Sequence, residues 1–445
     1  MRQIGEEMSK FFTDVELQAG RLDEPALREN FSDLHPALSE HEAMVAADRC
    51  YFCYDAPCVS ACPTEIDIPT FIRQISTGMP IASARTILEQ NILGGMCARV
   101  CPTETLCEQA CVRELAEGKP VEIGRLQRFA TDAMMALEFH PFERAAPTHK
   151  SVAVVGAGPA GLAAAHRLAM LGHEVKLFDS RSKSGGLNEY GIAAYKATDN
   201  IAQKEFEWLM KIGGISVMND KMLGRDFTLD EIRNEYGAIF LSVGLCDVRR
   251  LNIAGEDLRN VENAVDFIEK VRQSDDYSHV PVGSNVVVIG GGMTAVDAAV
   301  QAKLLGADEV SLVYRRGQNK MPASVYEQEL AKSKGVRILF DATPKEIKGD
   351  ECVDTVIFEV GQSNRLLELR TDHVLKAIGQ VMGDLPEKLE MTNGKIKVDV
   401  NFKTSIDKVW AGGDCTDLGE DLTVTAVAHG RDAAKNIHIA LIGEE

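Results

Sequence analysis

Two segments of this chain each alternate a strand, a glycine-rich turn, a helix and a second strand, and this pattern limits the fold more than any other feature. The first, SVAVVGAGPAGLAAAHRLAMLGHEVKLFD, begins at Ser151, and the second, NVVVIGGGMTAVDAAVQAKLLGADEVSLVYRR, begins at Asn285. A βαβ unit of this kind builds a parallel sheet covered by helices. The two copies predict two Rossmann-like dinucleotide-binding domains of the α/β class.

The first glycine turn follows the pattern G-x-G-x-x-G. Its first glycine permits a tight turn, its second lets the backbone approach a pyrophosphate, and its third permits close packing of helix and strand. The N-terminus of the following helix then faces the phosphates. Asp179 ends the second strand, where a carboxylate can accept hydrogen bonds from an adenosine ribose. With Asp179, the expected dinucleotide contacts are Gly156, Gly158, Pro159, Ala160 and Gly161.

The second glycine turn differs from the first in the residues that close its second strand. That strand ends on Tyr314, Arg315 and Arg316 and carries no acid. Because the guanidinium fork binds a phosphate that a carboxylate would repel, this site is predicted to prefer the 2′-phosphate of NADPH. Two solvated surface arginines are the alternative interpretation. The expected contacts are Gly290, Gly291, Gly292, Met293, Thr294, Ala295, Arg315 and Arg316.

Two dinucleotide sites with different ribose chemistry suggest a nicotinamide and a flavin, and the acidic site is predicted to take FAD. Near the C-terminus, a short strand from Val409 runs into a Gly-Asp turn, and a helix is expected from Leu422 to Leu441. In flavoproteins with two dinucleotide domains, such a turn returns the chain to the first domain, so the second domain is inserted in the first. The expected flavin contacts are Gly185, Gly186, Leu187, Gly413, Asp414, Thr423 and Thr425.

Eight of the eleven cysteines lie in two runs upstream of these motifs. The first run reads C-x2-C-x4-C-x3-C-P, close to the ferredoxin pattern in which the fourth cysteine reaches another cluster. Two [4Fe–4S] clusters with interleaved ligands are the first hypothesis. Structural zinc is a competing interpretation, but it explains neither C-P junction. The runs are Cys50, Cys53, Cys58 and Cys62, then Cys97, Cys101, Cys107 and Cys111.

Length and composition bound the class of protein. A chain of 445 residues is too long for one hydrophobic core, and a net charge of −19 argues against a general nucleic-acid binder. Its longest apolar runs fall short of the roughly 18 to 20 residues that span a bilayer, and its N-terminus does not resemble a secretion signal. These features predict a cytoplasmic protein without disulfides or a membrane anchor.

The domain organisation follows from changes of pattern along the chain. Residues 1–148 are predicted to form a helical iron–sulfur domain, with helices over Ile68 to Ser76, Ile81 to Ile92 and Ile123 to Leu137. Polar residues 1 to about 45 are expected to form helical turns. The FAD-binding domain is expected at 149–270 and 377–445, and the NAD(P)H-binding domain at 271–376.

This order of motifs resembles the electron-input module shared by the glutamate synthase small subunit and dihydropyrimidine dehydrogenase, over about residues 40 to 445. The stretch MCARVCPTETLCEQACVRELAEGKPVEIGRLQRFATD is most similar to the dihydropyrimidine dehydrogenase branch. There, the cysteine matching Cys97 is not a ligand and a glutamine matching Gln127 completes the second cluster, where glutamate synthase has a glutamate. The resemblance implies one cluster on Cys50, Cys53, Cys58 and Cys111, and another on Cys62, Cys101, Cys107 and Gln127.

The resemblance also implies a function. The chain is expected to take a hydride from NADPH onto FAD and to pass single electrons through two [4Fe–4S] clusters to a separate FMN-containing subunit that reduces uracil and thymine. No protein acid or base is required for the hydride step, so no catalytic residue is predicted. A glutamate synthase small subunit or a related NADPH:acceptor oxidoreductase is the alternative enzyme, and a zinc-stabilised binding scaffold is the alternative outside enzymes.

Two further features complete the sequence-based expectations. Met293 stands where the family commonly has an acidic residue after the second glycine turn, which weakens the case for a contact from this position to the nicotinamide half. Cys246, Cys352 and Cys415 are isolated from the two runs, and they are expected to be buried small residues.

Overall fold

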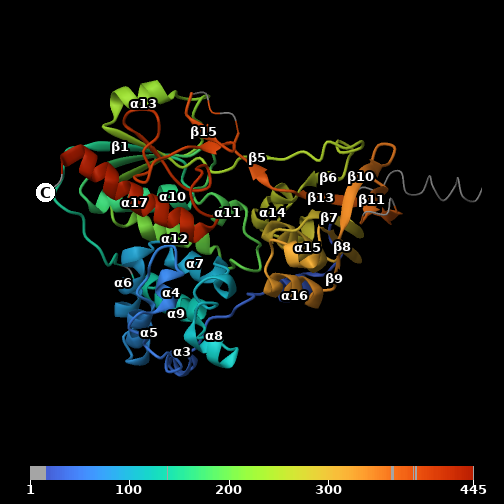
Figure 1. Cartoon of the computed structure of the whole chain (residues 1–445), viewed down its shortest axis with the longest axis horizontal. Coiled ribbons are helices and arrows are strands. Elements are labelled where there is room, and N and C mark those ends of the chain that lie inside the picture. The colour runs from blue at the N-terminus through green and yellow to red at the C-terminus, as the bar shows by residue number, and fades with distance from the viewer. Residues whose placement is uncertain (1–16, 138, 362–364, 384, 386–387, 444–445) are drawn as a thin grey trace, which may run out of the picture. The chain divides into compact units, whose positions relative to one another are not determined.

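The computed structural model describes residues 17–137, 139–361, 365–383, 385 and 388–443 (Figure 1). The first sixteen residues, part of the segment expected to form helical turns, lie outside this set. The chain divides into two compact units, and the three-domain division stays a prediction. One unit comprises the chain up to Leu34, Tyr190–Thr198 and Val248–Gln380, and the other comprises His35–Glu189, Asp199–Asp247 and Val381–Glu445.

The unit that contains the cysteine runs is built on a five-stranded parallel sheet. Its strand order is β17-β4-β1-β2-β3. The C-terminal strand β17 pairs in parallel with β4, with Val409 opposite Ile239. The expected return of the Gly-Asp segment to the first dinucleotide domain is therefore confirmed. The strands are β1 (Ser151–Val155), β2 (Glu174–Phe178), β3 (Ile215–Met218), β4 (Ala238–Leu241) and β17 (Val409–Ala411).

Helices cover this sheet and place its glycine turn. Helix α10 (Pro159–Met170) connects β1 to β2 and packs against α17 (Thr423–Ile442). Gly430 permits that contact, since a Cβ there would lie 2.0 Å from the carbonyl oxygen of Ala160. The same unit contains α12 (Ile201–Met210), α13 (Leu229–Glu235), a small hairpin of β15 (Met391–Thr392) and β16 (Lys395–Ile396), and all of α11 (Leu187–Tyr190) except its last residue.

The cysteine runs lie in a helical domain of short helices, as predicted. Pro69 lies in the first turn of α5, and the Asp67 side chain accepts a hydrogen bond from the Thr70 amide 3.1 Å away. One apolar face of that helix, including Phe71 and Ile75, is fully buried. The helices are α3 (Glu40–Ala47), α4 (Pro57–Ser60), α5 (Ile68–Ser76), α6 (Pro80–Gln90), α7 (Gly94–Val100), η1 (Thr103–Thr105), α8 (Val112–Glu117) and α9 (Ile123–Met135).

The other unit repeats the parallel architecture. Its five-stranded sheet has the order β6-β13-β7-β8-β9, and an antiparallel sheet adds β10-β11-β12. The strands are β6 (Val261–Asn263), β7 (Asn285–Gly290), β8 (Glu309–Val313), β9 (Val336–Leu339), β10 (Ala342–Lys348), β11 (Thr355–Val360), β12 (Arg365–Arg370) and β13 (His373–Ala377). The helices are α2 (Glu24–Asn30), α14 (Ala264–Arg272), α15 (Met293–Leu304) and α16 (Val325–Ser333).

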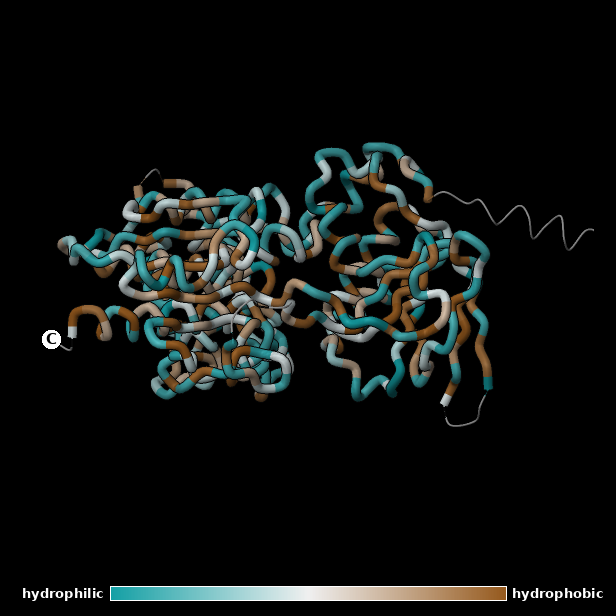
Figure 2. Tube along the Cα trace, turned by 90° about the horizontal axis from the view of Figure 1, so that it is seen from above, coloured by the Kyte–Doolittle hydropathy of each residue, from teal (hydrophilic) through white to brown (hydrophobic). Residues whose placement is uncertain are grey.

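Hydrophobic residues are concentrated in the strands and helix faces of each unit. Figure 2 shows brown, hydrophobic stretches running through the interior of the unit that contains β1, while its marginal loops are mostly hydrophilic. Val152 and Val154 of β1 and Val288 of β7 are fully buried. Among the helices described in the structure, none is long and apolar enough to cross a membrane.

Candidate cluster cavities and dinucleotide sites

Four cysteines line a first cavity in the helical domain. Cys50 and Cys53 lie in the loop after α3, Cys58 lies on α4, and Cys111 precedes α8. They surround about 370 Å³ of space not filled by atoms, against an apolar wall that includes Ile68 and Ile123. These four cysteines are the ones that the family resemblance implied as ligands of one cluster.

A second cavity lies beside the first and also contains thiols. It comprises about 390 Å³ of space not filled by atoms, part of it open to solvent, and it shares Ile68 and Ile123 with the first cavity. Its candidate donors are five in number, because Cys97 lines it together with the predicted glutamine. They are Cys62, Cys97, Cys101, Cys107 and Gln127.

Each cysteine run contributes one residue to the cavity that is lined mainly by the other run. Cys62 belongs to the first run but lines the second cavity, whereas Cys111 belongs to the second run and lines the first. Interleaved clusters require this crossing. The geometry admits both Cys97 and Gln127 at the second cavity, so the choice between them stays a prediction.

Burial and neighbouring thiols disfavour ionisation of several cysteines in both cavities. Burial, followed by the neighbouring thiolates, raises the pKa of Cys58 to about 12, and burial also raises the pKa of Cys50. A hydrogen bond to Cys97 and then burial raise the pKa of Cys101, while burial and Glu108 raise the pKa of Cys107. Thiolates become favourable in such surroundings when positive metal charge compensates them.

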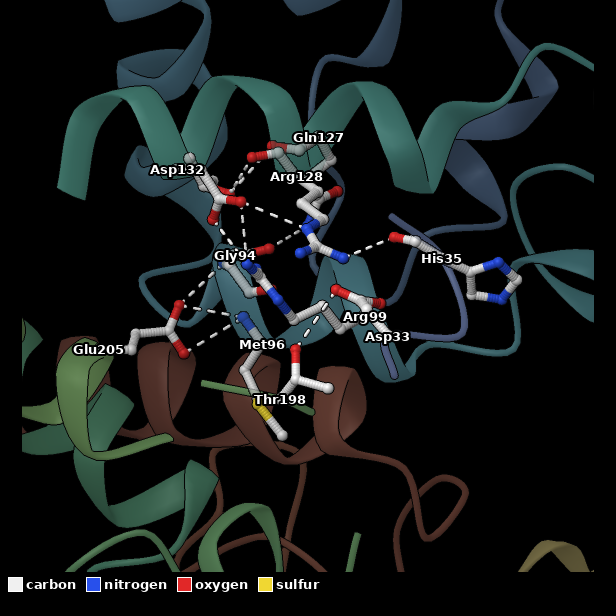
Figure 3. A network of polar contacts seen from close by, with 12 residues as sticks. Asp33, His35, Gly94, Met96, Arg99, Gln127, Arg128, Asp132, Thr198 and Glu205 are labelled. Carbon is white, nitrogen blue, oxygen red and sulfur yellow. Dashed lines mark hydrogen bonds and ion pairs between the residues drawn. The ribbon is translucent and has the colours of Figure 1, made fainter. Parts of the chain in front are cut away.

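The side-chain amide nitrogen of Gln127 forms a hydrogen bond within the protein. It is buried on α9, and Nε2 donates to the carbonyl oxygen of Gly94 at 2.7 Å (Figure 3). No donor among the described residues pairs with Oε1. The amide therefore keeps a neutral oxygen acceptor that could serve as a ligand in the second cavity.

The first glycine turn forms a cradle with no room for larger residues. Gly156 has φ +102°, and a Cβ there would lie 2.2 Å from the carbonyl oxygen of Ser242. A Cβ on Gly161 would lie 1.8 Å from the Gly156 carbonyl oxygen, and one on Gly186 would lie 2.7 Å from the Cα of Gly158. The loop that carries Gly185, Gly186 and the exposed Leu187 therefore lies against the turn that opens α10 at Pro159 and Ala160.

Two carboxylates flank this cradle. Asp179 accepts hydrogen bonds from the amides of Ala157 at 2.6 Å and Arg181 at 2.8 Å. Burial and the charge of Asp421 raise the pKa of Asp414 to about 6, and no donor among the described residues pairs with the Asp414 carboxylate. A partly buried carboxylate without such a hydrogen-bond donor fits the hydroxyls of a bound ribitol chain.

The start of α17 closes the other side of the flavin-type site. The Thr423 hydroxyl donates to Oδ1 of Asn188 at 3.1 Å, and Thr425 is buried in the same first turn of α17. Gly413 has φ +80°, and a Cβ there would lie 3.0 Å from the Ala160 Cβ. The predicted flavin contacts from three separate segments thus converge around α10. FAD is consistent with this donor set.

The second glycine turn is open where a pyrophosphate would lie. A Cβ on Gly292 would meet no atom within 4 Å, although one on Gly291 would lie 2.3 Å from the ring of Tyr314. Gly292 caps α15, whose first residues are Met293, Thr294 and Ala295. Gly290 packs against Ala377, and Arg315 and Arg316 are exposed beyond β8. The turn and the arginines belong to the same unit, as a dinucleotide site requires.

Two results were not anticipated from the sequence. Cys352 and Cys415 are buried as expected, but Cys246 is exposed, so its prediction was wrong. It lies in the irregular segment after β4, outside the hydrophobic core. Glu205 was missed, although its position among Ile201, Ala202, Trp208 and Leu209 on the buried face of α12 is a detectable signal.

Comparisons with known proteins agree with this arrangement. The model of the pyridine nucleotide-disulphide oxidoreductase family matches residues 150–430. The model described as dihydropyrimidine dehydrogenase domain II, 4Fe-4S cluster, matches residues 27–139. Each model thus covers a part of the chain for which the sequence predicted the corresponding cofactor.

Two relatives match along almost the whole chain. The NAD-dependent dihydropyrimidine dehydrogenase subunit PreT of Escherichia coli is 34 % identical over 94 % of this chain and 98 % of its own length. The glutamate synthase [NADPH] small chain of Azospirillum brasilense is 32 % identical over 92 % of each chain.

Solved structures share the fold of the dinucleotide-binding part. FprA of Mycobacterium tuberculosis in complex with NADPH has a TM-score of 0.55 at 20 % identity, covering 65 % of this chain and 84 % of that one. Thioredoxin reductase of Lactococcus lactis has a TM-score of 0.55 at 22 % identity, and the match covers 66 % of this chain and 99 % of that one. The chain belongs to the pyridine nucleotide-disulphide oxidoreductase family, in the branch of PreT and the glutamate synthase small chain, and is an NAD(P)H-dependent iron–sulfur flavoprotein oxidoreductase.

Proposed function

We propose that the chain is the electron-input subunit of a two-subunit dihydropyrimidine dehydrogenase, whose FMN-containing partner reduces uracil and thymine to 5,6-dihydropyrimidines. When bound, the cofactors supply hydride transfer from NADPH to FAD and one-electron transfer through two [4Fe–4S] clusters. The chain's own residues would bind and orient these groups.

The proposed route of the electrons follows from the positions of the two cavities relative to the flavin-type site and the surface. Val424, in the first turn of α17, lines the second cavity, while its neighbours Thr423 and Thr425 are expected to face the flavin. Ile68 and Ile123 form a wall common to both cavities. The first cavity is also lined by Tyr51, whose side chain is exposed. Electrons would therefore enter at the second cavity and leave from the first.

The presence of glutamine at position 127 favours this function over the glutamate synthase alternative. Gln127 lines the second cavity and keeps an oxygen acceptor there, where the glutamate synthase branch is expected to have a glutamate. We assign the first cluster to Cys50, Cys53, Cys58 and Cys111, and the second to Cys62, Cys101, Cys107 and Gln127. The name of the PreT relative, a dihydropyrimidine dehydrogenase subunit, supports the same choice.

The purified chain tests the partner hypothesis directly. It should reduce artificial electron acceptors with NADPH but should leave uracil unreduced. Addition of an FMN-containing pyrimidine-reducing subunit should restore uracil-dependent oxidation of NADPH. Uracil reduction by the chain alone would contradict the requirement for a partner, and glutamine-dependent glutamate formation with a glutamate synthase large subunit would favour the alternative.

Nicotinamide preference needs its own test, because the names of the two relatives differ: one is NAD-dependent and the other uses NADPH. The exposed Arg315 and Arg316 support NADPH here. Arg315→Ala and Arg316→Ala should each raise KM for NADPH while changing KM for NADH little, because only the 2′-phosphate requires the guanidinium fork. Unchanged discrimination in both variants would remove the phosphate assignment.

The zinc scaffold predicts a different metal content. A structural zinc site needs several side chains gathered around a single ion. Among the described residues, no group of three or more His, Cys, Asp or Glu side chains is gathered in this way. Each thiol set instead surrounds a cavity. Metal analysis after anaerobic purification separates the two interpretations, since two clusters predict about eight irons per FAD and the scaffold predicts zinc without iron.

A further inference from the structure

Glu205 is a buried carboxylate whose hydrogen-bond partners lie in another part of the sequence. It is 2 % exposed on α12. Oε1 accepts from the amide of Gly95 at 2.8 Å and from the amide of Met96 at 3.1 Å, and Oε2 lies 3.3 Å from the Met96 amide (Figure 3). A helix of the flavin-binding sheet thus supplies the acceptor for the first amides of α7, which lies among the cysteines.

Helix α7 supports residues of the second cavity at both ends. At its start, the Gly94 carbonyl oxygen accepts from Nε2 of Gln127. At its end, Cys101 is the C-cap residue and lines the same cavity. Two of the four proposed donors of the second cluster therefore depend on where α7 lies, one of them directly and the other through a hydrogen bond.

The fit between Glu205 and α7 is tight. A Cβ on Gly95 would lie 2.8 Å from Oε1 of Glu205 and 2.9 Å from Cε of Met135. A Cβ on Gly94 would lie 2.7 Å from Cγ2 of Ile87. The paired glycines are therefore needed for the close approach that brings the amides to the carboxylate.

A second contact holds the other face of the same helix. Arg99 donates to the Gly95 carbonyl oxygen at 2.9 Å and to both carboxylate oxygens of Asp132 at 2.8 and 2.9 Å. Asp132 is on α9, little more than one turn after Gln127. Arg99 thus fixes α7 against α9, while Glu205 fixes it against α12.

We propose that Glu205 is a positioning residue for the second cluster: by holding α7, it sets the Gly94 carbonyl that orients Gln127 and the position of Cys101. The inference rests on the proposed function, because it presupposes a cluster in the second cavity. It adds a residue outside the cysteine domain, contributed by the flavin-binding domain, to the support of that cluster. Glu205 itself does not line the cavity.

The test compares three variants of the full chain, purified anaerobically with their cofactors. Glu205→Ala removes both acceptor oxygens, whereas Glu205→Gln keeps one. The control is Glu256→Ala in the other unit, because Glu256 is 3 % exposed and also accepts from two backbone amides, those of Leu251 at 2.9 Å and Asn252 at 2.8 Å. Iron content, FAD content and EPR-monitored reduction potentials are measured for each variant.

Glu205→Ala should change the EPR signal and the potential of the second cluster, or lose about four of about eight irons, with the first cluster and FAD content unchanged. Glu205→Gln should shift the reduction potential of the second cluster in the same direction but by a smaller amount. This variant tests the positioning role if Glu205→Ala does not fold. Glu256→Ala should leave both clusters as in the wild type.

Four results would overturn the inference. Unchanged second-cluster signals in every Glu205 variant, with two clusters in the wild type, would leave the proposed function intact and remove the positioning role. Equal changes in both clusters, or the same changes in Glu256→Ala, would show general destabilisation. Absence of a second cluster from the wild type would instead refute the proposed function, and the inference would fail with it.

Discussion

The two cavities share a wall but differ in their donors and in their surroundings. The first is lined by four thiols from loops and helix ends, next to Tyr51, which is 52 % exposed. The second has Gln127 on a buried helix face, held through Gly94 on α7, with Glu205 behind that helix. Exposed residues therefore line part of the first cavity, whereas the residues that line the second are buried or partly buried.

This difference has an electrostatic consequence. In the proposed assignment, the second cavity supplies three thiolates and a neutral amide, which carry one negative charge fewer than four thiolates. The lower charge raises the reduction potential of a cluster, and burial and hydrogen bonds to its sulfurs modify that value. The two sites are therefore expected to have separate potentials, although the cysteines that form them come from similar runs.

The largest expected effect comes from the crossing cysteines. Cys62→Ser should remove the second cluster and Cys111→Ser the first, each with loss of about four of eight irons. The expectation follows from the cavities rather than from the runs, since each residue lines the cavity of the other run. Iron analysis and EPR of the two variants measure it. If Cys62→Ser removed the same EPR signal as Cys50→Ser, the interleaved arrangement would be wrong.

A smaller effect is expected at the amide. Gln127→Ala should destabilise the second cluster and alter its EPR signal, because three thiolates remain and the fourth position is left to solvent. FAD content should not change, since Gln127 lies on α9 and not in the flavin-type cradle. Visible and EPR spectra of the anaerobic protein provide the measurement. A wild-type spectrum would exclude Gln127 as a ligand.

The flavin-type site should respond to pH through Asp414. Burial raises the pKa of this carboxyl to about 6, and the ionised form is the better acceptor for ribitol hydroxyls. FAD affinity should therefore fall as pH drops below 6, by up to about tenfold per pH unit. Titration of the apoprotein by flavin fluorescence measures this change. Asp414→Asn should bind FAD more weakly at pH 7.5 and should lack this dependence.

The smallest effect is expected for Cys97. It lines the second cavity and hydrogen-bonds with Cys101, but the assignment leaves it without iron. Cys97→Ser should therefore keep both clusters and about eight irons. It is also the matched control for Gln127→Ala, because both positions line one cavity. Loss of the second cluster in Cys97→Ser, with retention in Gln127→Ala, would instead assign Cys97 as the fourth ligand in place of Gln127.

Local patterns predicted most of the fold. The turns at Gly156 and Gly290 and the helix from Ile68 to Ser76 follow from residue spacing, and the structure has them at those positions. The return of β17 beside β4 was also predictable, because the Gly-Asp segment has a known place in two-domain flavoproteins.

The contacts that hold the second cavity could not be predicted in the same way. Glu205 and Gly95 are 110 residues apart, and no spacing rule connects a carboxylate on one helix with amides at the start of another. Spacing alone also favoured Cys97 over Gln127. The error at Cys246 has a related cause, since the sequence does not show where the segment after β4 leaves the core.

One measurement tests the central claim that the two cavities hold different clusters. It is an EPR-monitored redox titration of the anaerobic wild type and of Gln127→Cys. Two [4Fe–4S] components with separate potentials are expected in the wild type, and the added thiolate should lower only one of them. A single component in the wild type, or equal shifts of both components in Gln127→Cys, would contradict the account.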